Sequence, residues 1–116
     1  MATTKAYTDL NQSEKLAEFL PIESADMYWD YDYSIYTGEY KYYPMVMDDR
    51  FDDVCIPCWS LAALLAVLPK GINISTPKPV NELGYCCWNQ YDEIYASNPV
   101  DACVEMILKL HELNLL

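Results

Sequence analysis

The chain has 116 residues, of which 53% are hydrophobic, and its formal net charge is −11. This length fits one domain with a sizeable core, since single domains most often have about 100–150 residues. The negative charge disfavours direct nucleic-acid binding and adsorption to anionic membranes, because both depend on Lys and Arg. A partner that complements this charge would present a basic protein surface.

Nothing in the sequence has the form of an export signal or a membrane span. The longest uninterrupted apolar run covers residues 61–68 and is far shorter than the roughly 20 residues that a spanning helix needs. Five cysteines are an odd number in a chain without an export signal. We therefore expect a cytoplasmic protein with reduced thiols and no cofactor.

The N-terminal part of the chain predicts a flexible arm followed by a short helix. We expect the arm over residues 1–9. The segment Asn11–Glu14 then has the form of a capping box, in which an N-cap side chain is followed three residues later by Glu. Pro21 stops the helix, because the residue before a proline avoids the α region. The helix is predicted over about residues 13–20.

The stretch 23–53 holds most of the net charge and most of the tyrosines. It contains nine acidic residues against two basic ones, and seven of the eleven tyrosines. From Met27 onward apolar and polar residues alternate, which is typical of a half-buried strand. Thr37-Gly38 can form a two-residue turn, so residues 27–46 are predicted to form an antiparallel hairpin.

The predicted hairpin has aromatic side chains on both faces, whereas one domain core can cover only one of them. Four tyrosines fit a face that packs on the helices: Tyr31, Tyr33, Tyr40 and Tyr42. Three others are candidates for exposed anchor residues, because tyrosine is enriched at interface hot spots: Tyr28, Tyr36 and Tyr43. For these three, packing in the core is an equal alternative.

An acidic loop follows the hairpin and is expected to be solvated. Its carboxylates are candidates for contact with a basic partner: Asp48, Asp49, Asp52 and Asp53. The loop lacks the glycine and the closing glutamate of an EF-hand, so the sequence favours a plain acidic loop over a cation site.

Two helices and three short strands complete the predicted fold. Residues 58–68 are apolar almost all round and predict the central buried helix. Asn98 can cap a last helix over residues 99–113, with Pro99 in its first turn. The strands are predicted over three segments, of which the last two pair with each other: 72–75, 83–88 and 91–95.

The predicted order of elements is α-β-β-α-β-β-β-α. It indicates a compact single α+β domain over residues 1–116, in which two or three helices pack on a mainly antiparallel sheet of about five strands.

Three segments, taken together, resemble a group of small uncharacterised proteins of gut Bacteroidales and their phages or prophages: KLAEFLPIESADMYW (15–29), IPCWSLAALLAVLP (56–69) and NPVDACVEMILKLHELNLL (98–116). The group has no established activity, so the resemblance carries over no catalytic residue. It implies a phage or mobile-element setting.

The segment Cys55-Ile56-Pro57-Cys58 is the one recognisable chemical motif. A C-x-x-C at a helix N-terminus looks like the redox motif of thioredoxin-like proteins, because the helix dipole stabilises the first thiolate. Here an acidic loop precedes it instead of a buried parallel strand, and the acids oppose the dipole. A zinc site with Cys86 and Cys87 would need neighbouring strand residues, which point to opposite faces, to share one ion.

These observations predict a non-enzymatic, acidic binding protein of phage or mobile-element origin. Its tyrosine-rich hairpin would engage a basic protein surface, and one specific form would be a host-factor inhibitor that mimics the phosphates of nucleic acid. The alternative is a thiol redox or metal-binding protein that uses Cys55 and Cys58. A third hypothesis is self-association through the aromatic hairpin edge.

Overall fold

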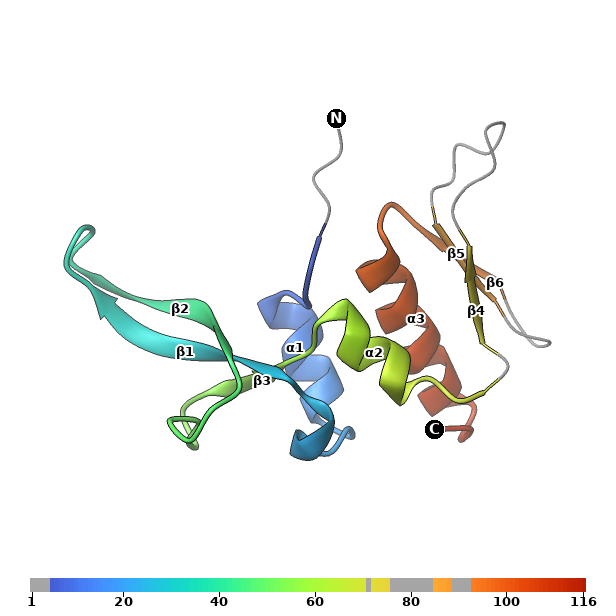
Figure 1. Ribbon diagram of the computed structural model, residues 1–116, viewed down its shortest axis with the longest axis horizontal. Helices are drawn as coiled ribbons and strands as arrows, with labels where there is room; N and C mark the ends of the chain where they lie inside the picture. Colours follow the sequence, from blue (N-terminus) through green and yellow to red (C-terminus); the bar gives the residue numbers. More distant parts are fainter. Residues whose placement is uncertain (1–4, 71, 76–84, 89–92) are drawn as a thin grey trace.

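The computed structural model has an α+β fold with antiparallel sheets (Figure 1). It describes residues 5–70, 72–75, 85–88 and 93–116. Among these residues there are three α-helices: α1 (Leu10–Ala17), α2 (Leu61–Val67) and α3 (Pro99–Glu112). A short 3-10 helix, η1 (Ile22–Ser24), follows α1. The expected α+β class is confirmed.

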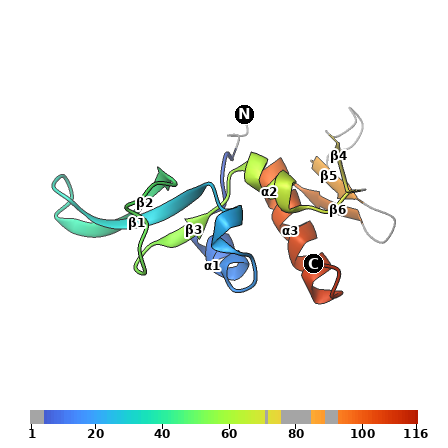
Figure 2. The ribbon, with the colours of Figure 1, turned by 60° about the horizontal axis from the view of Figure 1, so that its bottom comes forward.

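The strands form two antiparallel sheets rather than one. The first sheet has the order β2-β1-β3, from β1 (Met27–Ser34), β2 (Glu39–Val46) and β3 (Ile56–Cys58). The second has the order β4-β5-β6, from β4 (Asn73–Ser75), β5 (Tyr85–Trp88) and β6 (Glu93–Ala96). Figure 2 shows the helices between the two sheets. The hairpin of β1 with β2 and the pairing of β5 with β6 are confirmed.

α1 begins at Leu10, earlier than the sequence predicts, because Asp9 caps it. The Asp9 carboxylate accepts the N–H of Gln12 at 2.8 Å, and the Gln12 side chain accepts the N–H of Asp9 at 3.1 Å. This reciprocal pair is a capping box. The capping box predicted at Asn11–Glu14 is therefore wrong by two residues.

Residues 5–9, expected as part of a flexible arm, lie against the rest of the fold. Thr8 is fully buried, and its N–H donates to the carbonyl of Trp59 at 2.9 Å. The Lys5 ammonium lies 2.8 Å from the carboxylate of Asp101 in α3. This segment therefore links the N-terminal region to the first turn of α3.

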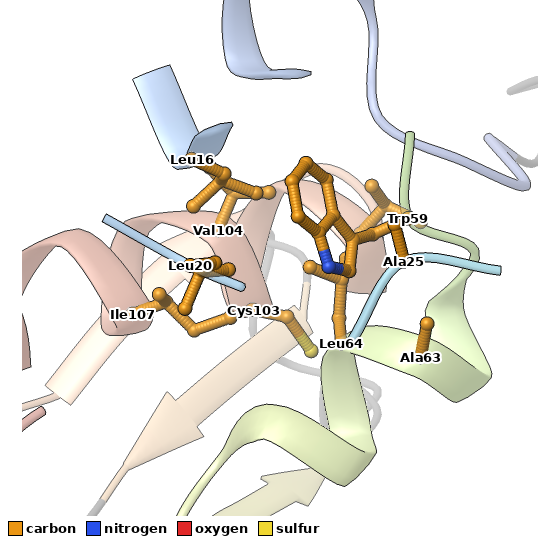
Figure 3. Packing of buried hydrophobic residues seen from close by; sticks show 10 residues of the cluster. Leu16, Leu20, Ala25, Trp59, Ala63, Leu64, Cys103, Val104 and Ile107 are labelled. Carbon is orange, nitrogen blue, oxygen red and sulfur yellow. The ribbon is translucent and has the colours of Figure 1, made fainter. Parts of the chain in front are cut away.

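α3 is buried on two sides and fills the central place that the sequence predicts for residues 58–68. Its predicted cap is confirmed, since the Asn98 side chain accepts the N–H of Asp101 at 2.8 Å. One side packs in a cluster around Trp59, shown in Figure 3, that includes residues of all three helices and of the segment after α1: Leu16, Leu20, Ala25, Ala63, Leu64, Val100, Cys103, Val104 and Ile107. The other side contributes a smaller cluster with β6 and its neighbours: Ala102, Met106 and Leu110.

α2 begins three residues later than expected and has one exposed side. Ser60 caps it by accepting the N–H of Ala63 at 3.2 Å, and Cys58 belongs to β3. Within α2 only Ala63 and Leu64 are buried, while Leu65 is 47% exposed. The prediction of a central helix buried almost all round is therefore wrong for this segment.

Adjacent leucines of α2 provide a test of this packing. We expect Leu64→Ala to lower the free energy of unfolding by about 2–5 kcal/mol, because it leaves a cavity in the Trp59 cluster. Leu65→Ala removes the same atoms from an exposed side and should cost less than about 1 kcal/mol. Urea unfolding of both variants measures the difference. Equal losses would contradict the orientation of α2.

The pH dependence of the free energy of unfolding tests the ion pair between Lys5 and Asp101. Burial alone would raise the pKa of Asp101, but hydrogen bonds from Lys5, Gln12 and Asn98 outweigh it and hold the pKa below its usual range. Because the folded pKa is the lower one, this stabilisation is present above about pH 4 and is lost as pH falls through the folded value.

We expect Asp101→Asn to lower the free energy of unfolding at neutral pH by about 0.5–1 kcal/mol. It should also flatten the decline in stability between about pH 5 and pH 2. Urea unfolding at several pH values measures both effects. The control is Asp49→Asn, which makes the same charge change at an exposed residue. An unchanged pH slope for Asp101→Asn would refute a role for this carboxylate.

Candidate functional site

The hairpin of β1 and β2 is much longer than the strand that joins it to the rest of the fold. All eight residues of β1 pair with β2, from Met27 opposite Val46 onward, whereas β3 pairs only with Met27–Trp29. Beyond this three-stranded base, residues 30–43 project away from the helices in Figures 1 and 2. We call residues 30–43 the hairpin arm.

The arm turns through a four-residue loop, 35–38, in place of the predicted two-residue turn. Gly38 has a φ of 72°, a conformation that glycine adopts at little cost, and its N–H donates to the carbonyl of Ser34 at 2.8 Å. Ile35 and Tyr36 therefore lie at the tip of the arm. They are 80% and 93% exposed, so the candidate residue Tyr36 is available to a partner.

Four tyrosines share one face of the arm, because residues opposite each other in a hairpin point to the same side. The ring centroid of Tyr31 lies 4.9 Å from that of Tyr42 and 5.4 Å from that of Tyr40. The ring centroids of Tyr33 and Tyr40 are 5.3 Å apart. All four are between 36% and 60% exposed. The prediction that they pack on the helices is wrong. We call them the tyrosine face: Tyr31, Tyr33, Tyr40 and Tyr42.

The opposite face of the arm carries its charged side chains. Asp32 lies opposite Lys41, an opposite-charge cross-strand pair, and Asp30 lies opposite the candidate residue Tyr43, which is half-buried. The arm is a single ribbon of two strands. The field of these carboxylates therefore reaches the tyrosine face, well within the Debye length of about 8 Å at physiological salt.

Tyr28 belongs to the base of the arm and is not an exposed anchor residue. Its side chain is fully buried, and its ring meets that of Phe51 edge to face at 5.6 Å. Its hydroxyl donates to the carboxylate of Asp48 at 2.8 Å. Burial, together with this nearby carboxylate, raises the pKa of Tyr28 to about 12. Of the two alternatives for Tyr28, core packing is the correct one.

Two of the four candidate carboxylates hold the acidic loop in place. Asp48 accepts two hydrogen bonds from the Arg50 guanidinium, at 3.0 and 2.7 Å, and these, with the one from Tyr28, hold its pKa below the usual range. Asp52 accepts from the Cys55 thiol at 3.4 Å. The other two are exposed and remain available to a partner: Asp49 and Asp53.

The structure does not bring the two cysteines of the C-x-x-C motif together. Cys55 directly precedes β3 and Cys58 is its last residue, and three steps of extended backbone span about 10 Å, beyond the reach of a disulfide. Both thiols are free, and the Cys58 thiol donates to the carbonyl of Thr8 at 3.4 Å. Burial raises the pKa of both thiols. A low-pKa redox thiol at a helix N-terminus is therefore not the arrangement found here.

The zinc site weighed above would need four cysteines, of which only Cys55 and Cys58 have described side chains. The side chains of Cys86 and Cys87 lie outside the part of the chain that is described. In the described part, no group of three or more His, Cys, Asp or Glu side chains is placed to hold a metal ion. That part also has no helix that is both long and apolar enough to cross a membrane.

No family model, curated protein or solved structure matches this chain.

The amino-acid composition of the arm contains the signal that identifies the tyrosine face as exposed. Among residues 30–43, Ile35 is the one aliphatic side chain, and it lies in the loop. A strand face covered by a core is usually rich in aliphatic side chains, whereas tyrosine suits a surface with one side in water. A strand pattern built on tyrosine alone is therefore typical of a half-exposed face.

The surroundings of the two cysteines give a prediction for their reactivity. In the folded protein, alkylation of Cys55 and Cys58 near pH 7.5 should be at least about tenfold slower than in urea, because both thiols are buried and have raised pKa values. Mass spectrometry of the labelled peptides measures each rate. Rapid labelling of Cys55 in the folded protein, or a disulfide to Cys58, would favour the redox alternative.

Proposed function

We propose that this protein is a non-enzymatic binding module whose hairpin arm engages a basic surface of another protein. The observation that carries the proposal is the tyrosine face, which lies on a projecting ribbon and is partly exposed throughout. Tyrosine offers a large, rigid contact area that loses little conformational entropy on binding, and it is enriched at interface hot spots.

The arm contributes little to the core, which favours a role in binding over a role in stabilising the fold. None of its residues belongs to either buried cluster of the described fold. A two-stranded ribbon is only marginally stable by itself, and cross-strand pairs contribute about 0.2–1 kcal/mol each. Contacts between the rings of Tyr31, Tyr40 and Tyr42 favour an ordered arm before binding, so a partner would spend less free energy on immobilising these side chains.

Charge supports a basic partner. With a net charge of −11, two copies of the chain repel each other, whereas a basic surface is attracted. Asp49 and Asp53 are exposed in the loop at the base of the arm and add to this attraction. Such carboxylates mainly raise the association rate, while the tyrosines supply contact area.

The sequence resemblance suggests the setting of this function. In a phage or prophage setting, a chain with the cytoplasmic location that we expect from the sequence would meet a cytoplasmic protein of the host or of the phage. Inhibition of a host factor through its basic surface is the specific form of binding that this setting favours.

Affinity capture with paired variants tests the proposal. The immobilised protein should capture a basic protein from a Bacteroidales lysate, and Tyr31→Thr/Tyr40→Thr should reduce this capture at least about tenfold, since threonine keeps strand propensity but removes the rings. The control is Leu65→Ser on α2, where the native side chain is exposed to the same fraction as Tyr31.

Circular dichroism first shows that each variant is folded. Capture that weakens equally in Leu65→Ser, or that is the same for all variants and insensitive to 0.5 M salt, would refute binding through the arm.

A further inference from the structure

The outer edge of β1 is open along the arm. β3 pairs with β1 only as far as Trp29, so in the described structure residues 31–34 have β2 on one side and no strand on the other. The N–H of Tyr33 donates to the carboxylate of Asp32 at 2.8 Å, and an added strand would exchange this local bond for one along the ladder. Such an edge is a template for an added strand.

The other edge of the arm is less suited to an added strand. β2 carries Lys41 in the arm and Pro44 at its base, and Lys and Pro are the residues that blunt an exposed edge. The β1 edge instead carries Asp30 and Asp32. A basic segment would therefore be attracted to β1 and a second copy of this chain repelled.

The spacing of the tyrosines matches that of an extended segment. Tyr31 and Tyr33 lie two residues apart on β1, so their side chains repeat about every 6.6–6.8 Å. A strand added beside β1 has the same repeat and directs alternate side chains to the tyrosine face. A guanidinium or ammonium group at each of these positions would lie next to a tyrosine ring, where cation–π attraction favours it.

We infer that the arm binds an extended segment of its partner that has Arg or Lys at alternate positions, paired along the β1 edge with these cations against the tyrosine face. This inference rests on the proposed function and specifies the chemistry of the partner. The intervening residues of such a segment would face the side of the arm that carries Asp30 and Asp32.

Binding of synthetic peptides tests the inference. The probe is a blocked nonapeptide in which Arg alternates with Thr, and its control contains the same residues with all the arginines in one block. We expect the alternating peptide to bind at least about fivefold more tightly by calorimetry and to shift the amide resonances of residues 31–34. Two further peptides are N-methylated, one at every Arg and one at every Thr, so that each loses the N–H groups of one strand edge and keeps those of the other; only the peptide whose methyl groups lie on the edge that faces β1 should lose binding.

Substitutions at the tyrosine face separate cation–π attraction from simple apolar contact. Tyr33→Phe keeps the aromatic ring and should change the dissociation constant by less than about twofold. Tyr33→Leu keeps an apolar side chain without the ring and should weaken binding about threefold to tenfold. Equal effects of Phe and Leu would refute the cation–π contact.

The outcomes distinguish this inference from the function on which it rests. Equal binding of the alternating and block peptides, or no binding of either while capture in lysate still depends on Tyr31 and Tyr40, would overturn edge pairing alone. Loss of both the peptide binding and the tyrosine-dependent capture would overturn the proposed function as well. Dimerisation through the arm, detected by sedimentation at two concentrations, would assign the edge to a second copy and contradict the inference.

Discussion

The packing of α3 between two buried clusters is the interaction on which the described fold depends. Cys103 and Ile107 face the cluster around Trp59, while Met106 and Leu110 face the second sheet. Burying a side chain of this size contributes about 1.5–3 kcal/mol, so one helix holds both parts of the fold together. Neither buried cluster of the described fold includes a residue of the arm, so the outer part of the arm is free of any role in packing the core.

The unequal lengths of the strands in the first sheet then decide which residues are exposed. At the base of the arm both faces of β1 are covered: Tyr28 packs under the acidic loop, and the Trp29 indole donates to Ser13 in α1 at 3.2 Å. Two residues further along, β3 has ended and neither face is covered. The arm therefore projects from a firmly packed base, which is how a rigid contact surface is positioned.

Local signals in the sequence predict α3 and the hairpin correctly, because the Asn98 cap and the strand alternation need no knowledge of the rest of the fold. The features that the sequence did not predict, the packed N-terminal segment and β3, depend on contacts between residues far apart in the chain. The Lys5–Asp101 ion pair holds the N-terminal segment in place, and β3 forms only by pairing with β1. Alternation identifies the two faces of a strand but not where a covering layer ends. It therefore left the role of Tyr28 open and assigned the tyrosine face to the core.

The composition of the arm reconciles exposure with solubility. An open strand edge rich in Val and Ile would promote aggregation, whereas tyrosine keeps its hydroxyl in water and still pairs well in a strand. Asp30 and Asp32 add repulsion between copies at the edge where pairing would begin. This repulsion is selective, because the field of the same carboxylates attracts a strand that carries positive charge to this edge. The carboxylates that oppose self-association thus favour a basic partner.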